Sequence, residues 1–239
     1  MPETHKGGKG KAFSFFFFGA TPPIGKSGCA AAAGYDDAKW FNPYSAESFM
    51  DRGDSYFEKG DYGNAIADYT EAIRLDPSNA NYFYDRGCVY NRKKEYDNAI
   101  ADYTEVIRLA PEKAEMYQKR GLAYRDKGDF DKSIADYNEA IRLDWNLAKT
   151  YCGRGHTYLG AGDHDNAIKD YTESILIDPV YARAYCYRGK AYSNKGDMDK
   201  ALADYSEAIR LDPDNEDAQK ALTGFNAGKS PNNAGATVM

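Results

Sequence analysis

The sequence predicts an all-α protein built from five tandem pairs of helices, and three observations support this fold class. A period of 34 residues runs through residues 46–213, and five copies in one register indicate a repeat protein. Each copy contains an Arg-Gly pair, a Tyr three residues after the Gly and a later Asp-Tyr pair. Apolar residues within a copy follow helical spacing, as in Ala65, Ile66, Tyr69, Ala72 and Ile73.

The recurrent glycines fix the position of each copy: Gly53, Gly87, Gly121, Gly155 and Gly189. We therefore expect about ten repeat helices, in repeats at 46–79, 80–113, 114–147, 148–181 and 182–215. A short capping helix at 216–225 would cover the apolar face that the last repeat otherwise exposes. Residues 1–45 would form a low-complexity arm, and residues 226–239 a flexible tail.

Turn residues divide each repeat into two helices. Four repeats carry a Gly-Asp pair between the helices, beginning at Gly60, Gly128, Gly162 and Gly196. Gly tolerates a left-handed backbone at the end of one helix, and Asp accepts hydrogen bonds from the free N–H groups of the next. The second helix is ended by proline, which cannot continue the hydrogen-bond ladder, at Pro77, Pro111, Pro179 and Pro213.

Two departures weaken this pattern. Lys94-Glu95 replaces Gly-Asp in the second repeat. A left-handed residue there would cost on the order of 1 kcal/mol, so we expect this turn to fray. Trp145 replaces the third proline, and we expect it to cover the junction between the third and fourth repeats.

With these residues the chain resembles the tetratricopeptide repeat family over about residues 46–213. The resemblance implies antiparallel helix pairs stacked into a right-handed α-solenoid, with the first helices lining a concave groove. It also implies a protein or peptide partner. Thirteen of the 21 tyrosines occupy three recurrent positions, and we expect them in the core. The recurrent Arg and Asp, such as Arg52 and Asp68, should pair between the two helices of a repeat.

The partner-binding residues should lie on the inner faces of the first helices, at i, i+4 and i+7 spacing. Unlike the core positions, these differ in every repeat. They are Met50, Asp54, Phe57, Tyr84, Cys88, Asn91, Gln118, Leu122, Arg125, Cys152, His156, Leu159, Cys186, Lys190 and Ser193.

Charge along this face is polarised. The first two repeats contribute Glu47, Asp51, Asp54, Glu58 and Asp85, and the later repeats contribute Lys119, Arg125, Lys149, Arg183 and Lys190. Some family members clamp the acidic C-terminus of chaperones with Lys, Asn and Arg. The matching positions here are Met50, Asp54, Asp85, Glu115 and Lys119. Only one of them is basic, so we predict no binding of chaperone tails.

Composition argues against several classes of function. The net charge is −6, and residues 46–225 alone carry −9, whereas nucleic-acid binding demands clustered Lys and Arg. Four cysteines without close pairs favour a reducing, cytoplasmic compartment. The longest apolar run, 15–20, is too short to span a bilayer. Lys6, Lys9 and Lys11 before this run imitate a secretory signal, so export by a non-standard signal stays open.

Two motifs suggest chemistry that we do not predict. Residues 20–27 satisfy a permissive phosphate-binding loop pattern, but that loop needs a parallel sheet, which about forty residues cannot build. Cys152, His156 and Cys186 could offer zinc ligands. However, equivalent residues of neighbouring repeats lie about 8–10 Å apart, which is too far for shared coordination. We therefore predict no metal, no cofactor, no catalytic residue and no enzyme.

The expected function is a non-enzymatic scaffold that binds a protein or peptide in the groove. The alternative is a self-assembling structural subunit, joined through the solenoid ends or the N-terminal arm. That arm is a possible docking segment because its aromatic side chains would be an aggregation hazard if exposed. They are Phe13, Phe15, Phe16, Phe17 and Phe18.

Overall fold

The computed structural model describes residues 44–228, and this part of the chain contains eleven α-helices and no strand. All of these helices belong to one unit, residues 42–239. The helices are α1 (Ala46–Glu58), α2 (Tyr62–Leu75), α3 (Ala80–Arg92), α4 (Tyr96–Leu109), α5 (Ala114–Lys127), α6 (Phe130–Leu143), α7 (Ala148–Gly160), α8 (His164–Ile177), α9 (Ala182–Asn194), α10 (Met198–Leu211) and α11 (Glu216–Gly228).

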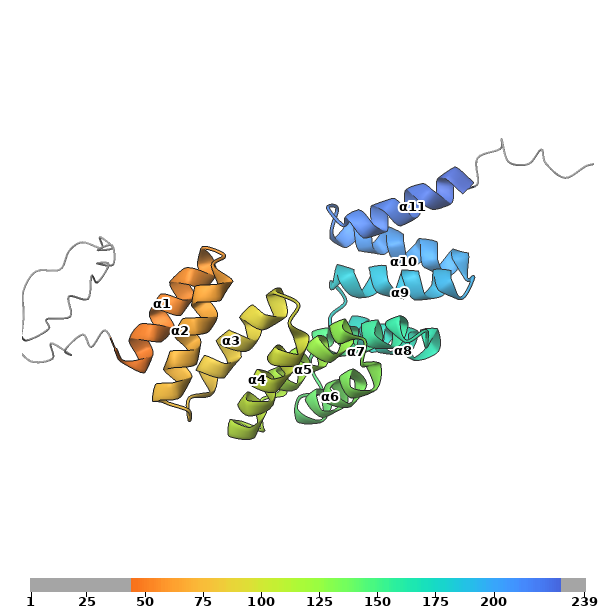
Figure 1. The fold of residues 1–239 in the computed structure, drawn as a ribbon. Helices are drawn as coiled ribbons and strands as arrows, with labels where there is room; N and C mark the ends of the chain where they lie inside the picture. Colours follow the sequence, from red (N-terminus) through yellow and green to blue (C-terminus); the bar gives the residue numbers. More distant parts are fainter. Residues whose placement is uncertain (1–43, 229–239) are drawn as a thin grey trace, which may run out of the picture. The chain divides into compact units, whose positions relative to one another are not determined.

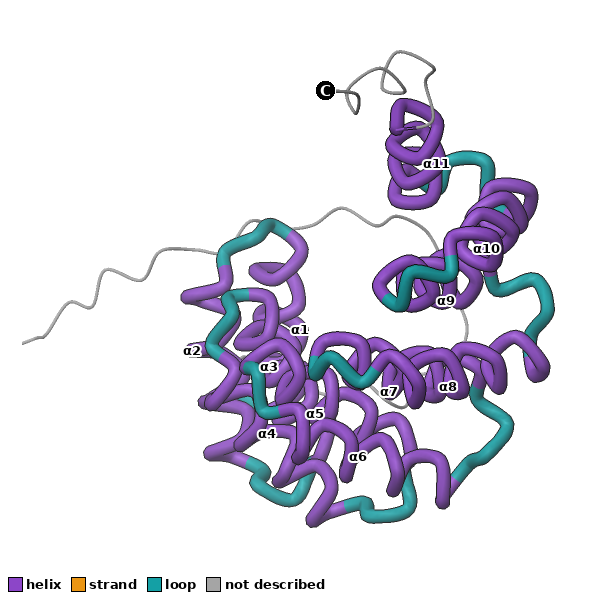
Figure 2. Tube along the Cα trace, turned by 90° about the vertical axis from the view of Figure 1, so that its right-hand side faces the viewer, coloured by secondary structure: helices purple, strands orange, loops and turns teal. Residues whose placement is uncertain are grey.

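The helices pack in consecutive pairs, from α1 with α2 to α9 with α10 (Figure 1). Each second helix also packs against the first helix of the following pair, and the first helix α7 contacts both α5 and α9. The trace in Figure 2 shows short loops between successive helices. Because each pair contacts only its neighbours, the fold is an α-solenoid. The predicted all-α solenoid is confirmed.

The turns between paired helices form as the Gly-Asp pattern predicts. Gly60, Gly128, Gly162 and Gly196 have φ angles of 76°, 92°, 82° and 83°, in the left-handed region that glycine tolerates. The Asp after each glycine is the N-cap of the next helix, where its side chain accepts a hydrogen bond from a backbone N–H three residues later.

The second repeat makes the same turn without glycine. Lys94 has a φ of 62° and is the single non-glycine residue with positive φ among residues 44–228. The Glu95 N–H donates to the Tyr90 carbonyl at 2.9 Å, as the Asp61 N–H does to Tyr56 in the first repeat. Both flanking helices keep the lengths found in other repeats, so the predicted fraying was wrong. An ion pair of 2.6 Å between Lys93 and Glu95 supports the turn, and Lys94 bears the strain.

The core repeats the same contact five times. A tyrosine of the second helix packs its ring against the glycine of the first helix, and all five tyrosines are buried. They are Tyr69, Tyr103, Tyr137, Tyr171 and Tyr205. A Cβ atom added at Gly53 would lie only 2.7 Å from Tyr69, which shows how closely the two helices approach.

The predicted Arg–Asp pairs are present in all five repeats. Each guanidinium donates two hydrogen bonds of 2.7–2.9 Å to one buried carboxylate. From the second repeat on, the same guanidinium also reaches the preceding repeat, as in Arg86 to Thr70 at 3.0 Å and Arg154 to Asn138 at 2.6 Å. The arginine therefore joins neighbouring repeats as well as the helices of one repeat.

Two further sequence predictions need correction. Trp145 is 70% exposed and does not cover the junction between the third and fourth repeats. The loop turns without it, because the Asp144 carboxylate accepts from the Asn146 N–H at 3.1 Å.

The capping helix α11 extends to Gly228 rather than Phe225, and it buries Ala218 against α10. Of the helices described here, none is both long and apolar enough to cross a membrane.

Candidate peptide-binding surface

The first helices present a continuous row of side chains that touch across successive repeats. The Arg92 guanidinium lies over the Phe57 ring at 5.2 Å, and the Lys119 ammonium lies over the Tyr84 ring at 5.7 Å. Further along, the Arg125 Nη1 atom lies 3.2 Å from His156 Nδ1. The His156 ring stacks on the Tyr187 ring, with the two ring centroids 4.6 Å apart. We call this row, with the exposed Asp54 and Lys190 beside it, the inner surface.

The predicted binding residues separate into three groups by exposure. Asp54 and Lys190 are exposed. Nine are half-buried beside the cores: Met50, Phe57, Tyr84, Cys88, Asn91, Gln118, Leu122, Arg125 and His156. Ser193 belongs with them. The structure brings these two groups onto one side of the first helices, as the i, i+4, i+7 spacing predicts.

Three predicted binding residues are buried and cannot meet a partner. Cys152, Leu159 and Cys186 retain only 4%, 8% and 4% of their exposure. Cys152 and Leu159 pack with Tyr171 of the same repeat, and Cys186 packs with Ala218 of α11. Their helices turn these positions toward the following helix pair, so we assign them to the core.

Two inner-surface residues escaped the sequence analysis. Arg92 and Tyr187 each lie one residue beyond a predicted position, Asn91 and Cys186. The accessible stripe on these helices is therefore wider than a single i, i+4, i+7 line. An aromatic or cationic residue flanking the predicted line is the signal that could have identified them.

The acidic end of the inner surface lies in the first two repeats. The Tyr69 hydroxyl donates to Asp54 at 2.7 Å. Burial and the negative charge of Asp54 raise the pKa of Asp85 to about 6. Within residues 44–228 no hydrogen bond or ion pair satisfies the Asp85 carboxyl. A negative potential therefore covers this end of the surface.

The basic end lies in the third to fifth repeats. Burial, together with the positive charges of Arg125, Lys190 and Arg183, lowers the pKa of His156 to about 4. His156 is therefore neutral at physiological pH, and its Nδ1 must accept from Arg125, because a guanidinium can only donate. The proton of the neutral ring then resides on Nε2, which makes that atom a further donor.

The cysteines are poor candidates for a metal site. Burial raises the pKa of Cys152 to about 12 and that of Cys186 to about 11, which disfavours the thiolate that zinc requires. No cluster of three His, Cys, Asp or Glu side chains within 44–228 has the arrangement of a metal site. Cys29, the phosphate-loop pattern and the aromatic arm lie outside the described residues.

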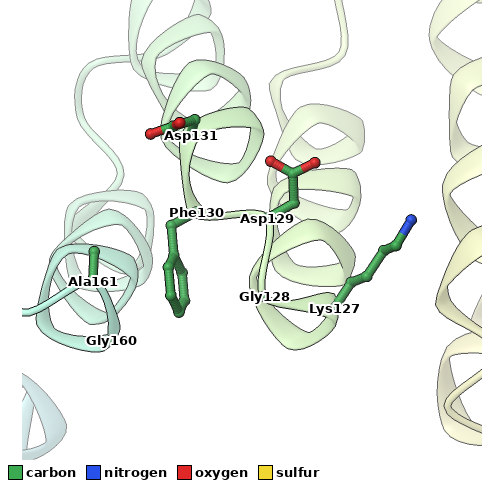
Figure 3. Close-up of a pocket in the computed structure, with 7 residues that line it drawn as sticks. All are labelled: Lys127, Gly128, Asp129, Phe130, Asp131, Gly160 and Ala161. Atoms are coloured by element: carbon green, nitrogen blue, oxygen red, sulfur yellow. The ribbon is translucent and has the colours of Figure 1, made fainter.

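One pocket of the described residues lies away from the inner surface. It has a volume of about 550 Å³ and is formed where the turn between α5 and α6 meets the end of α7 (Figure 3). The Phe130 ring lies against Gly160 there, and Lys127, Asp129 and Asp131 line the rest. None of the predicted binding residues lines this pocket. Two other pockets border the inner surface, one of about 370 Å³ lined by Cys186 and Tyr187 and one of about 600 Å³ lined by Gln118.

Comparison with known proteins agrees with this architecture. A family model described as TPR repeat matches residues 53–94 and 121–162, and one described as Tetratricopeptide repeat matches 80–113, 148–181 and 182–215. A search of curated proteins gave no match.

Several solved structures resemble the chain. A crystal structure of MamA protein is 30% identical, covers 70% of this chain and 92% of its own, and has a TM-score of 0.63. YrrB, a TPR protein, is 24% identical, covers 76% and 94%, and has a TM-score of 0.60. A thermophilic TPR protein of Thermus thermophilus is 18% identical, covers 75% and 98%, and has a TM-score of 0.59. The chain belongs to the tetratricopeptide repeat family.

Proposed function

We propose that this chain is a non-enzymatic scaffold that binds an extended segment of a protein partner on its inner surface. The observation that carries the proposal is the contrast between two rows of equivalent residues. The buried row is Tyr in all five repeats, whereas the inner row reads Asp54, Cys88, Leu122, His156 and Lys190.

This contrast separates what the fold needs from what it leaves free. A residue required by packing must recur, because each repeat buries the same helix–helix contact. The five equivalent positions of the inner row hold an acid, a thiol, an aliphatic group, an imidazole and an amine, and each repeat still forms the same pair of packed helices. Its chemistry is therefore available for recognition, and half-buried aromatic and arginine side chains such as Tyr84 and Arg125 are suited to anchor a partner.

A display selection tests the proposal. Random ten-residue segments, placed internally in a carrier protein, are selected on the full chain, and the affinity of enriched segments is measured by fluorescence anisotropy. Leu122→Ala combined with Arg125→Ala should weaken binding at least tenfold, because both side chains leave the inner surface. Lys169→Ala, which changes an exposed residue on α8, is the control variant. Equal affinity in the double variant would remove the inner surface from the binding site.

Tyr84 is better left unchanged in that experiment. Its ring packs against the buried residues of two repeats, including Phe83 and Tyr103. Truncating it would combine a loss of binding with a loss of stability.

A self-assembling structural subunit is the alternative to a scaffold for other proteins. Light scattering of the full chain over a range of concentrations distinguishes the two. A constant monomer mass supports the scaffold for a different partner, and a mass that grows with concentration supports self-assembly.

The chaperone-tail clamp is not part of the proposal, because Lys119 supplies a single basic group at the clamp positions. The three described cysteines are free thiols, which suits the reducing cytoplasm.

A further inference from the structure

The core tyrosines differ in one respect, the partner of the hydroxyl group. In the first repeat the Tyr69 hydroxyl donates to Asp54 at 2.7 Å, and in the second the Tyr103 hydroxyl lies 3.6 Å from the Cys88 sulfur. Within residues 44–228 the Tyr171 hydroxyl is buried without a hydrogen-bond partner, and the hydroxyls of Tyr137 and Tyr205 make no hydrogen bond to another residue. A buried hydroxyl without a partner costs free energy, so its retention calls for a physical reason.

The inner row explains why these hydroxyls lack an acceptor. The residue equivalent to Asp54 is Leu122 in the third repeat, which has no polar group, and His156 in the fourth. The single acceptor of neutral His156 already receives a hydrogen bond from Arg125. This part of the surface therefore holds more donors than acceptors.

Gly153 leaves the Tyr137 hydroxyl uncovered at the inner surface. Gly153 of α7 occupies the position that Tyr187 occupies in α9, one repeat of 34 residues later. A Cβ atom added to it would lie 2.8 Å from the Tyr137 hydroxyl oxygen, so any larger residue would cover that oxygen. Tyr137 itself is 4% exposed and is otherwise enclosed. The hydroxyl is thus a donor fixed by the core, and the absence of a side chain at Gly153 leaves it uncovered.

Arg125 lies near the Tyr137 side chain, and Lys190 and Arg183 join it near His156. Arg125 uses three N–H groups on Asp126 and His156, which leaves two of its five free. Lys190 and Arg183 are exposed, and across the described helices neither has an ion-pair partner. The opposing charges are Asp126, already paired with Arg125, and four acids that line a pocket with Arg183 and Tyr187: Asp212, Asp214, Glu216 and Asp217.

We propose that Tyr137, Arg125, His156 and Lys190 form a donor cluster that binds the carboxylate of an Asp or Glu side chain in the partner segment. The cluster offers donors and positive charge, and a carboxylate is an acceptor with no proton to give at neutral pH. The acids of the first two repeats repel the same side chain, so it is directed to the third to fifth repeats. The inference rests on the proposed function, since it assigns one side chain of the segment that the inner surface binds.

The display selection described above provides the probe. Because the random segments lie inside a carrier protein, they have no terminal carboxylate, and any acidic preference comes from Asp or Glu side chains. We expect Asp or Glu at one fixed position of the enriched segments. Replacing that residue by Asn or Gln in a synthetic peptide, acetylated and amidated at its ends, should weaken binding about tenfold.

Two substitutions link this preference to the cluster. Tyr137→Phe removes only a hydroxyl that makes no protein hydrogen bond, so folding should be unchanged while affinity for the acidic peptide falls about tenfold. The affinity of the Asn or Gln peptide should change little, since the lost interaction is specific to the carboxylate. Tyr103→Phe is the matched control in the second repeat and should leave both affinities unchanged. Lys190→Glu should weaken the acidic peptide further, and Lys169→Glu on α8 should not.

The possible outcomes separate this inference from the proposed function. Enriched segments without a fixed acidic position, or equal loss of both peptides in Tyr137→Phe, would overturn the donor cluster while leaving the peptide-binding surface in place. No enriched segment at all would overturn both. Loss that is confined to the acidic peptide and to the cluster variants supports the inference.

Discussion

Replacing Gly155 by alanine adds one methyl group where the two helices of the fourth repeat approach most closely. The new Cβ would lie 2.9 Å from Tyr171 Cε1, 3.0 Å from Cδ1 and 3.2 Å from the Cβ of Asp170. Tyr171 is fully buried, so its ring has no free space into which to move. Either the ring or the helix must shift, and both belong to the repeated core contact.

The expected loss of stability is the difference between two effects. Overpacking of this kind costs about 1–3 kcal/mol. Alanine in a helix interior gains about 0.5–1 kcal/mol over glycine, because less backbone entropy is lost on folding. We therefore expect Gly155→Ala to lower the free energy of unfolding by up to about 2.5 kcal/mol.

Two other glycines supply matched controls. At Gly121 the nearest atoms to an added Cβ are 3.3 Å away, so overpacking and helix gain should nearly cancel. At the exposed Gly63, the second residue of α2, the nearest atom is 3.9 Å away, so the alanine variant should not be overpacked and should be at least as stable as the unchanged protein. Urea titrations followed by far-ultraviolet circular dichroism give the order Gly63→Ala, Gly121→Ala, Gly155→Ala from most to least stable. A Gly155→Ala protein as stable as Gly63→Ala would refute the argument from close helix contact.

Single residues elsewhere in the solenoid carry three more predictions. Lys94→Gly should raise the urea midpoint of unfolding by an amount equivalent to about 1 kcal/mol or less, because glycine relieves the left-handed strain at φ 62°. An unchanged or lower midpoint would show that the turn carries no backbone strain. Folding raises the pKa of Asp85 from 3.8 to about 6, so the charged form destabilises the fold and stability is lost as pH rises through this window. Asp85→Asn should therefore raise the melting temperature at pH 7.5 but not at pH 3.5, and an equal effect at both values would contradict the assignment. The His156 ring should keep constant NMR shifts between pH 8 and pH 5.5, since its pKa is lowered to about 4, and a midpoint near 6.5 would show that burial and its cationic neighbours do not act on it.

The fold could be predicted from the sequence because its interactions repeat every 34 residues. Each Arg–Asp pair, each Gly–Tyr contact and each Gly-Asp turn is specified locally, within one repeat, and five copies make the pattern visible. The turn at Lys94 shows the limit of this reasoning. Local propensity predicted fraying, but packing of α3 and α4 holds the backbone in the left-handed region.

The candidate site was only partly predictable, because exposure depends on how neighbouring repeats cross. The i, i+4, i+7 line correctly placed Asp54, Leu122 and Lys190 outside the core. It could not show that Cys152 and Cys186 turn toward the following helix pair, since sequence spacing carries no information on the angle between repeats. The prediction for Trp145 failed for a different reason. It is a loop residue, and no periodic pattern indicates the direction of its side chain.

The central claim is that the inner surface of the first helices binds the partner segment. Backbone amide shifts of the full ¹⁵N-labelled chain, recorded with and without a selected peptide, test this most directly. We predict that the largest changes fall on α3, α5, α7 and α9, centred on residues near Leu122, Arg125 and His156, and that α4, α6, α8 and α10 change little. Changes confined to those second helices, or to residues outside 44–228, would contradict the claim.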